Sequence, residues 1–125
     1  MSLRILIVDD SMAMRGLLKK ILGQSGLSIE KIVEAADGVE GLLRLRDNPI
    51  NFILSDINMP NMNGEDFVRS VKADKAYCDI PVLMVTTDNS TARVLRLQQL
   101  GAQGYICKPF TPQMVKDKVL AIIGS

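Results

Sequence analysis

The chain has 125 residues, of which 47% are apolar and 23% are charged, and its formal net charge is +1. This composition is that of an ordinary soluble domain with one sizeable core, and the near-neutral charge predicts neither a nucleic-acid-binding arm nor a membrane-binding patch. The sequence contains no histidine, which excludes Ser-His-Asp and Cys-His catalysis and every His-ligated metal site.

Nothing in the sequence predicts export or membrane insertion. No apolar run approaches the roughly 20 residues that span a bilayer, and the first ten residues, MSLRILIVDD, lack the pattern of a secretory signal. Cys78 and Cys107 are far apart and form no CxxC motif, so we expect reduced structural thiols. These features predict a cytoplasmic protein that contacts neither membranes nor nucleic acid directly.

Short apolar runs alternate with longer segments of helical periodicity along the whole chain. The apolar runs predict strands at 3–8, 29–35, 51–55, 81–86 and 104–108. The helical periods predict helices at 12–24, 37–47, 64–74, 90–100 and 111–123. The inner strands are continuously apolar, as expected when helices cover both faces of a sheet. We therefore predict a single α/β domain over residues 1–125 with a parallel sheet.

The residues at the carboxyl ends of the strands are the first candidates for a site, because ligands of such sheets bind beyond those ends. Four strands end in a set of three carboxylates, two hydroxyls and one ammonium. These residues are Asp9, Asp10, Asp56, Thr86, Thr87 and Lys108. The second strand, which ends in Glu34-Ala35-Ala36, offers no comparable group. Taken singly, an aspartate at a strand end is often only a helix N-cap, so it is their joint occurrence that indicates a site.

Three neighbouring carboxylates repel one another, and Lys108 offsets only part of that repulsion. At ~4 Å and an effective dielectric constant of ~20, each like-charge pair costs about 4 kcal/mol. Either the aspartates hold protons with raised pKa values or a divalent cation lies among them. Without histidine and with only two cysteines, such a cation would have oxygen ligands, which suits Mg²⁺.

A carboxylate beside magnesium is a nucleophile toward phosphorus, so these residues predict phosphoryl transfer to an aspartate. The chain has neither a GxGxxG nor a GxxxxGK[ST] motif, which indicates that it does not bind a nucleotide itself. The phosphoryl group is therefore expected to come from another molecule.

Four segments in this order resemble the receiver domain of two-component response regulators, and the resemblance covers the whole chain. The segments are LIVDDS, LSDINMPNMNG, VTT and GYICKPF. Within the family the chain is most similar to single-domain chemotaxis regulators. The resemblance implies a flavodoxin-like fold, with a five-stranded parallel sheet of strand order 2-1-3-4-5 and five helices on its two faces.

The resemblance also implies a role for each residue that matches the acidic motifs. Asp56 accepts the phosphoryl group from a phosphohistidine of a histidine kinase or phosphotransfer protein. Asp10 and Asp56 bind Mg²⁺, or Mn²⁺ in its place, through their carboxylates. Asn58 binds the same cation through its backbone carbonyl, and Asp9 acts through a bound water.

Three further matching residues are expected to respond to the phosphoryl group. Lys108 pairs with it, and the bond from Lys108 to Pro109 is expected to be cis. Thr86 moves its hydroxyl toward a phosphoryl oxygen, and Tyr105 swings inward as Thr86 moves. The result is a shift in the face formed by the fourth helix, fifth strand and fifth helix.

The fourth helix carries more apolar residues than one buried stripe needs. They are Val94, Leu95, Leu97 and Leu100. One reading is a core helix with slight excess apolar character; the other is a docking face for a downstream target protein or a second copy. The second reading predicts a monomer or a weak, phosphorylation-dependent dimer.

Other functions stay open at this point. The chain is either a stand-alone regulator or a receiver domain excised from a longer regulator or hybrid kinase. A magnesium-dependent aspartyl-phosphate phosphohydrolase generally has a second acid two residues after its nucleophile, where this chain has Asn58. A scaffold or flavin-binding module of the same fold is disfavoured by the acidic residues. Asp88, near the switch threonine, is expected either to orient an attacking water or to repel it.

Overall fold

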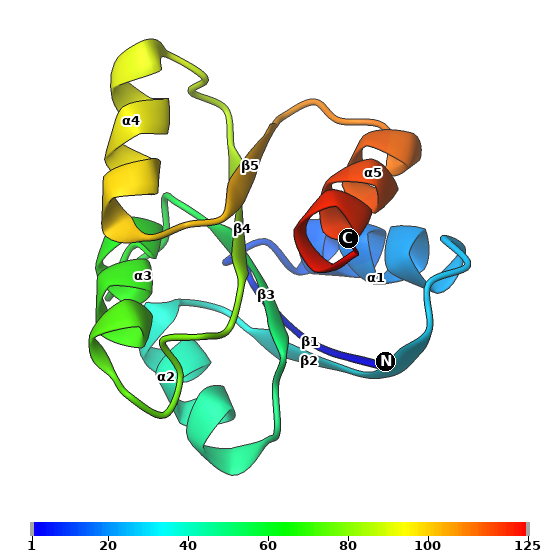
Figure 1. Cartoon of the computed structure of the whole chain (residues 1–125), viewed down its shortest axis with the longest axis horizontal. Coiled ribbons are helices and arrows are strands. Elements are labelled where there is room, and N and C mark those ends of the chain that lie inside the picture. Colours follow the sequence, from blue (N-terminus) through cyan, green and yellow to red (C-terminus); the bar gives the residue numbers. More distant parts are fainter. Residues whose placement is uncertain (1, 125) are drawn as a thin grey trace.

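The computed structural model describes residues 2–124, in which strands and helices alternate along the chain (Figure 1). The strands are β1 (Leu3–Val8), β2 (Ile29–Ala35), β3 (Phe52–Asp56), β4 (Val82–Thr86) and β5 (Gly104–Cys107). The helices are α1 (Met12–Gly23), α2 (Gly38–Asp47), α3 (Gly64–Ala73), α4 (Thr91–Leu100) and α5 (Pro112–Ile123). Every expected element is present, and each boundary agrees with the expected range to within one residue.

The third strand is shifted by one residue from its expected range of 51–55. Asn51 lies before the strand and uses its side-chain amide, which accepts from Arg4 N–H at 2.7 Å and donates to the Ser2 carbonyl at 3.0 Å. At the other end Asp56 belongs to the strand, because it pairs with Val85 in the ladder between β3 and β4. Asp56 is therefore held by the sheet itself rather than by the loop that follows.

All neighbouring strands are parallel, and their order is β2-β1-β3-β4-β5, as the resemblance implied. Val8 lies opposite Ser55, and Thr86 lies opposite Cys107. This register brings the carboxyl ends of β1, β3, β4 and β5 to the same edge of the sheet. The residues that follow these ends are thus neighbours in space although they are far apart in the sequence.

Helices cover both faces of the sheet: α1 and α5 lie on one side, and α2, α3 and α4 on the other (Figure 1). Alternate residues of each strand enter the two cores, so that Ile5 and Ile7 face α1 and α5 while Leu6 and Val8 face the opposite layer. This double coverage explains why the strands are continuously apolar. Within residues 2–124, none of the helices combines the length and apolar character needed to cross a membrane.

Each helix begins at a polar side chain that accepts a hydrogen bond from the backbone N–H three residues later. The capping residues are Ser11, Asp37, Asn63, Ser90 and Thr111. A cap of this kind satisfies one of the free N–H groups of the first turn and fixes the residue at which a helix starts. The loops at the carboxyl edge of the sheet therefore have defined lengths and end points.

The loop between β3 and α3 returns tightly against the end of β3. Gly64, the first residue of α3, donates its N–H to the Ile57 carbonyl at 2.7 Å. A Cβ atom at Gly64 would lie 2.1 Å from the Asp56 carbonyl oxygen. Only a residue without a side chain fits this approach of α3 to the end of the strand.

We expect Gly64→Ala to destabilise the fold by about 1–3 kcal/mol, the usual cost of forcing an atom into a packed region. Gly16 provides the matched control, because a Cβ there would meet nothing within 4 Å and the residue lies inside α1. Gly16→Ala should stabilise the protein by about 0.5–1 kcal/mol through helix propensity. Urea unfolding of both variants measures the difference, and equal stabilities would contradict the close approach.

Candidate functional site

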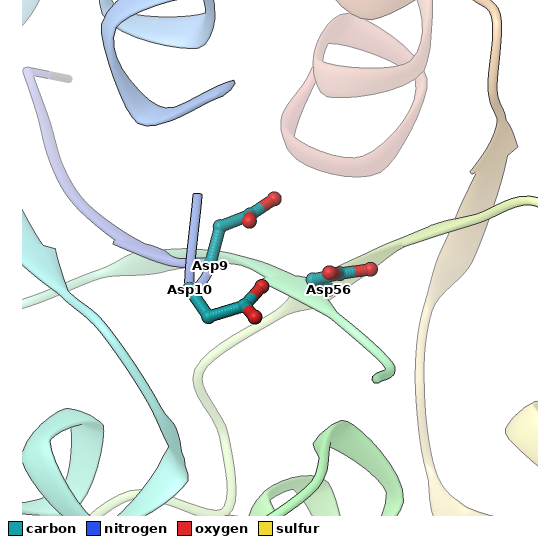
Figure 2. A group of neighbouring side chains, drawn as sticks. All are labelled: Asp9, Asp10 and Asp56. Atoms are coloured by element: carbon teal, nitrogen blue, oxygen red, sulfur yellow. The ribbon is translucent and has the colours of Figure 1, made fainter. Parts of the chain in front are cut away.

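Three carboxylates converge at the carboxyl edge of the sheet, as the strand-end residues predict. Asp9 and Asp10 follow β1, and Asp56 ends the neighbouring strand β3 (Figure 2). One carboxylate oxygen from each of the three lies within 4.8 Å of the others. Asp9 is buried, Asp56 is half-buried and Asp10 is exposed, so the cluster is open to solvent on one side.

Asp9 is held at three of its four polar atoms. Its N–H donates to the Ala35 carbonyl at 3.0 Å, and its own carbonyl accepts from Arg15 Nη1 at 2.7 Å. Its Oδ1 accepts from Ser11 N–H at 2.9 Å. Its Oδ2 is buried without a hydrogen-bond partner and lies 3.8 Å from Lys108 Nζ. Asp9 is 1% exposed, so this oxygen is a buried group whose hydrogen-bonding capacity is unused.

The pKa of Asp9 is raised above its ordinary value of 3.8, chiefly by burial. The negative charges of Asp56 and Asp10 raise the pKa further, while the Ser11 N–H and the Lys108 ammonium oppose the shift. Without a compensating cation, ionised Asp9 is therefore unfavourable in the fold. The unpartnered Oδ2 and the all-oxygen donor set fit a hard divalent cation, which prefers carboxylate, carbonyl and water ligands.

One carboxylate oxygen of Asp56 is held by neighbouring groups, and the other is free. Its Oδ1 accepts from Ile57 N–H at 2.8 Å and lies 3.5 Å from Lys108 Nζ. Its Oδ2 has no hydrogen-bond partner among the described residues, 2–124. The side chain is 12% exposed. A carboxylate fixed through one oxygen, with the other free and reachable from solvent, is suited to nucleophilic attack.

Lys108 and Thr86 reach the same edge from β5 and β4. Lys108 N–H donates to the Thr86 carbonyl at 2.7 Å, and its ammonium lies between Asp9 and Asp56. The Lys108–Pro109 bond is cis, as expected. The Thr86 hydroxyl is occupied within its own loop, because it accepts from Asp88 N–H at 2.9 Å and donates to the Asp88 carbonyl at 3.2 Å. Its expected movement toward a phosphoryl group stays a prediction.

The other expected site residues lie around the acidic cluster or away from it. Asn58 is exposed in the loop after β3, and its carbonyl as a metal ligand stays a prediction. Thr87 is exposed beyond the end of β4. Tyr105 is half-buried on β5, with Lys118 Nζ 5.6 Å from its ring centroid. Tyr105 therefore belongs to the face of α4, β5 and α5 and not to the cluster.

The second strand contributes a charged residue that the sequence reasoning missed. Glu34 Oε1 accepts from Arg15 Nε at 3.0 Å, and the same guanidinium holds the Asp9 carbonyl. Glu34 Oε2 also accepts from Lys19 Nζ at 3.1 Å. The available signal was the spacing of Arg15 and Lys19, which places two cations on one face of α1.

An ionic chain connects the loop after β4 to α3. Arg93 of α4 pairs with Glu65 of α3, and its Nε lies 3.5 Å from Asp88 Oδ2. Arg96 Nε binds the other oxygen of Glu65 at 3.0 Å. Asp88 Oδ1 accepts from Ser90 N–H at 2.9 Å. Ion pairs through Arg93 therefore connect the loop between β4 and α4, which binds the Thr86 hydroxyl, to Glu65 in the first turn of α3.

Comparisons with known proteins agree on one kind of molecule. A family model described as "Response regulator receiver domain" matches residues 5–120. Chemotaxis protein CheY1 of Helicobacter pylori is 40% identical over 124 residues, which are 98% of each chain. A solved structure of chemotaxis protein CheY4 from Vibrio cholerae is 32% identical, with a TM-score of 0.89 over 98% of this chain and 100% of that one. The solved receiver domain of a signal transduction histidine kinase from Syntrophus aciditrophicus is 30% identical, with a TM-score of 0.82 over 98% and 90%.

In metal-free buffer at neutral pH, we expect Asp9→Asn to stabilise the protein by roughly 0.5–2 kcal/mol. The substitution removes a buried negative charge that other carboxylates repel. The raised pKa sets the sign, because ionised Asp9 destabilises the native state at pH values above that pKa. The difference should shrink as the pH falls below the raised native pKa and vanish below 3.8, where Asp9 of the parent is protonated in both states. Urea unfolding at several pH values measures it, and a variant less stable than the parent at neutral pH would contradict the prediction.

Proposed function

The chain belongs to the response regulator receiver domain family, and on this premise we propose that phosphorylation of Asp56 is the event that switches it. The protein is thus a response regulator of two-component signal transduction. The donor is a phosphohistidine on a histidine kinase or a phosphotransfer protein. The observation that carries the assignment is the free Oδ2 of Asp56, which lies at a sheet edge beside two other carboxylates and an ammonium group.

The transfer requires little covalent chemistry from the protein beyond the nucleophile. An Asp56 oxygen attacks the phosphorus, and a P–O bond forms while the P–N bond of the phosphohistidine breaks. The bonding electron pair returns to the imidazole of the donor, which takes up a proton from solvent. Lys108 Nζ, already 3.5 Å from Asp56 Oδ1, lies where it neutralises charge on the incoming group.

The acidic residues are the proposed magnesium ligands. Asp10 and Asp56 would hold Mg²⁺, or Mn²⁺, through their carboxylates, Asn58 through its backbone carbonyl and Asp9 through water. The bound cation supplies charge neutralisation at the phosphoryl oxygens. Asp9 keeps a buried, unpartnered oxygen at the cluster, which supports this assignment. Relief of the repulsion among the carboxylates favours binding of the cation to the folded chain.

The switch proceeds through Thr86. To bond a phosphoryl oxygen, its hydroxyl gives up both contacts to the Asp88 main chain, so the loop between β4 and α4 must rearrange. Tyr105 then moves inward. Leu95 is 52% exposed on α4, which supports the docking reading of this helix, and Tyr105 and Met114 line a hollow between β5 and α5. The altered face of α4, β5 and α5 binds a downstream target protein or, weakly, a second copy.

The proposed setting is chemotaxis-type signalling in the cytoplasm, with residues 1–125 as one receiver domain. Similarity to chemotaxis protein CheY1 over 98% of each chain supports this setting. Similarity to the receiver domain of a histidine kinase favours the alternative, in which the same switch operates inside a longer kinase. In either setting the domain acts as a signalling element, with self-catalysed phosphotransfer and weak autodephosphorylation, rather than as a turnover enzyme.

Incubation with acetyl phosphate and Mg²⁺ should add one phosphoryl group, seen as about +80 Da in the intact mass. Asp56→Asn should remove the adduct completely, and EDTA should suppress it in the parent. An adduct that persists in Asp56→Asn would place the acceptor elsewhere and refute the proposed function.

We expect Thr86→Ala to bind the phosphoryl mimic beryllofluoride at Asp56 without a structural change in the face of α4, β5 and α5. In the parent, the amide NMR signals of Tyr105 and Leu95 should shift when the mimic is added with Mg²⁺. In Thr86→Ala these shifts should be lost, whereas the control Thr87→Ala, altered at an exposed neighbour, should keep them. Equal shifts in the parent and Thr86→Ala would show that the face responds by another route.

A further inference from the structure

We propose that Arg15 is a positioning residue of the acidic cluster, holding the main chain of Asp9 so that the carboxylates are placed to bind a divalent cation. Glu34 in turn holds Arg15. This inference rests on the proposed function, because it concerns the cation that the cluster would bind. It assigns a role to a residue of α1 and a residue of β2, neither of which is a proposed ligand of the cation.

The contacts of Arg15 reach the cluster through the backbone and not through a carboxylate. Its Nη1 donates to the Asp9 carbonyl at 2.7 Å, and its Nε donates to Glu34 Oε1 at 3.0 Å. The side chain is 15% exposed, so both bonds lie partly out of water. Hydrogen bonds from a guanidinium are stronger than neutral ones, and its planar fork fixes the two acceptors relative to each other.

Glu34 is a rigid anchor for this guanidinium. Its carboxylate also binds Lys19, and its carbonyl accepts from Arg44 Nε of α2 at 3.2 Å. Burial alone would raise the pKa of Glu34, but the hydrogen bonds and charges of Lys19 and Arg15 hold that pKa below its ordinary value. Glu34 therefore stays ionised at neutral pH and keeps its hold on Arg15.

The Asp9 carbonyl is part of the peptide plane that leads to Asp10. Asp10 is exposed, and its carboxylate has no hydrogen bond or ion pair among the described residues. The contact to Arg15 therefore restrains the position of the Asp10 backbone and the origin of its side chain, whereas no other contact restrains the carboxylate. Repulsion within the cluster acts to spread the carboxylates apart, and the Arg15 contact resists this by fixing the peptide.

Loss of Arg15 would leave the Asp9 carbonyl without its charged donor and would release the peptide plane. Residues that hold metal ligands in place typically contribute 10–100-fold to metal affinity when they are removed. We expect a loss in this range for Mg²⁺ binding by the unphosphorylated protein, before any phosphoryl donor is present.

The rival explanation is that Arg15 merely ties α1 to β2 through an ion pair. Lys19 separates the two, because it lies one turn further along α1 and binds the same carboxylate. Among the described residues, Lys19 has no hydrogen bond or ion pair with Asp9. A general weakening of the α1–β2 connection should follow from either substitution, whereas an effect on the cluster should follow only from the loss of Arg15.

The test compares Arg15→Met with Lys19→Met by titrating each metal-free protein with MgCl₂ in a calorimeter. The Kd of Arg15→Met should rise about 10–100-fold, while that of Lys19→Met should stay within about twofold of the parent. Arg15→Lys should recover only part of the affinity, because one ammonium lacks the fork that joins the two acceptors. A parent-like Kd in Arg15→Met, or an equal loss in Lys19→Met, would overturn the inference.

Glu34→Gln provides a second variant that keeps the side-chain volume and leaves Arg15 in place, should Arg15→Met fail to fold. Its weaker hold on the guanidinium should raise the Kd by several-fold, and an unchanged Kd would overturn the inference. A parent that binds no Mg²⁺ would overturn the proposed metal site as well. If the parent binds Mg²⁺ and takes up the phosphoryl group normally while Arg15→Met binds equally well, only the role of Arg15 is refuted.

Discussion

The mutual repulsion of three carboxylates at one sheet edge is the constraint around which this structure is arranged. The parallel register of β1 and β3 forces Asp9, Asp10 and Asp56 together, so the fold itself maintains an unfavourable charge cluster. Two apolar cores, one on each face of the sheet, supply the stability that tolerates it. The surrounding polar contacts limit the cost: Lys108 lies beside two of the carboxylates, and Arg15 holds the main chain of one. The same repulsion that destabilises the metal-free protein would favour binding of the proposed divalent cation.

Much of the fold could be predicted from the sequence, because strand and helix periods are local signals and the strand-end rule joins them. The acidic cluster followed from that rule without knowledge of strand order, since all carboxyl ends of a parallel sheet share one edge. The order of the strands came from family resemblance instead, and the structure agrees with it. The Arg15–Glu34 contact was missed, because it depends on which face of α1 is turned toward β2, and the strand order does not determine that. The hydrogen bonds of the Thr86 hydroxyl could not be predicted from the sequence either, because they depend on the path of the loop between β4 and α4.

The proposed phosphoacceptor, Asp56, lies apart from the face that would report its phosphorylation. Asp56 lies at the carboxyl edge of β3, whereas Tyr105 is half-buried on β5 beside residues of α4 and α5. Thr86 is the buried polar residue between them, and its hydroxyl is bound to the main chain of Asp88. In the proposed switch, Thr86 would therefore exchange its present hydrogen bonds to Asp88 for a hydrogen bond to the phosphoryl group. Such an exchange needs only a modest differential free energy, which suits a population shift between two packings.

The ion pair between Glu65 and Arg93 has a consequence for how such a domain diverges. The two residues lie on different helices and are partly buried, and each has one further partner, Asp88 for Arg93 and Arg96 for Glu65. Arg96 gives Glu65 a second partner, so the arginine at 93 is the more replaceable member. Across descendants of this chain, Glu65 should therefore be retained longer than Arg93, because its loss would remove a partner from two arginines.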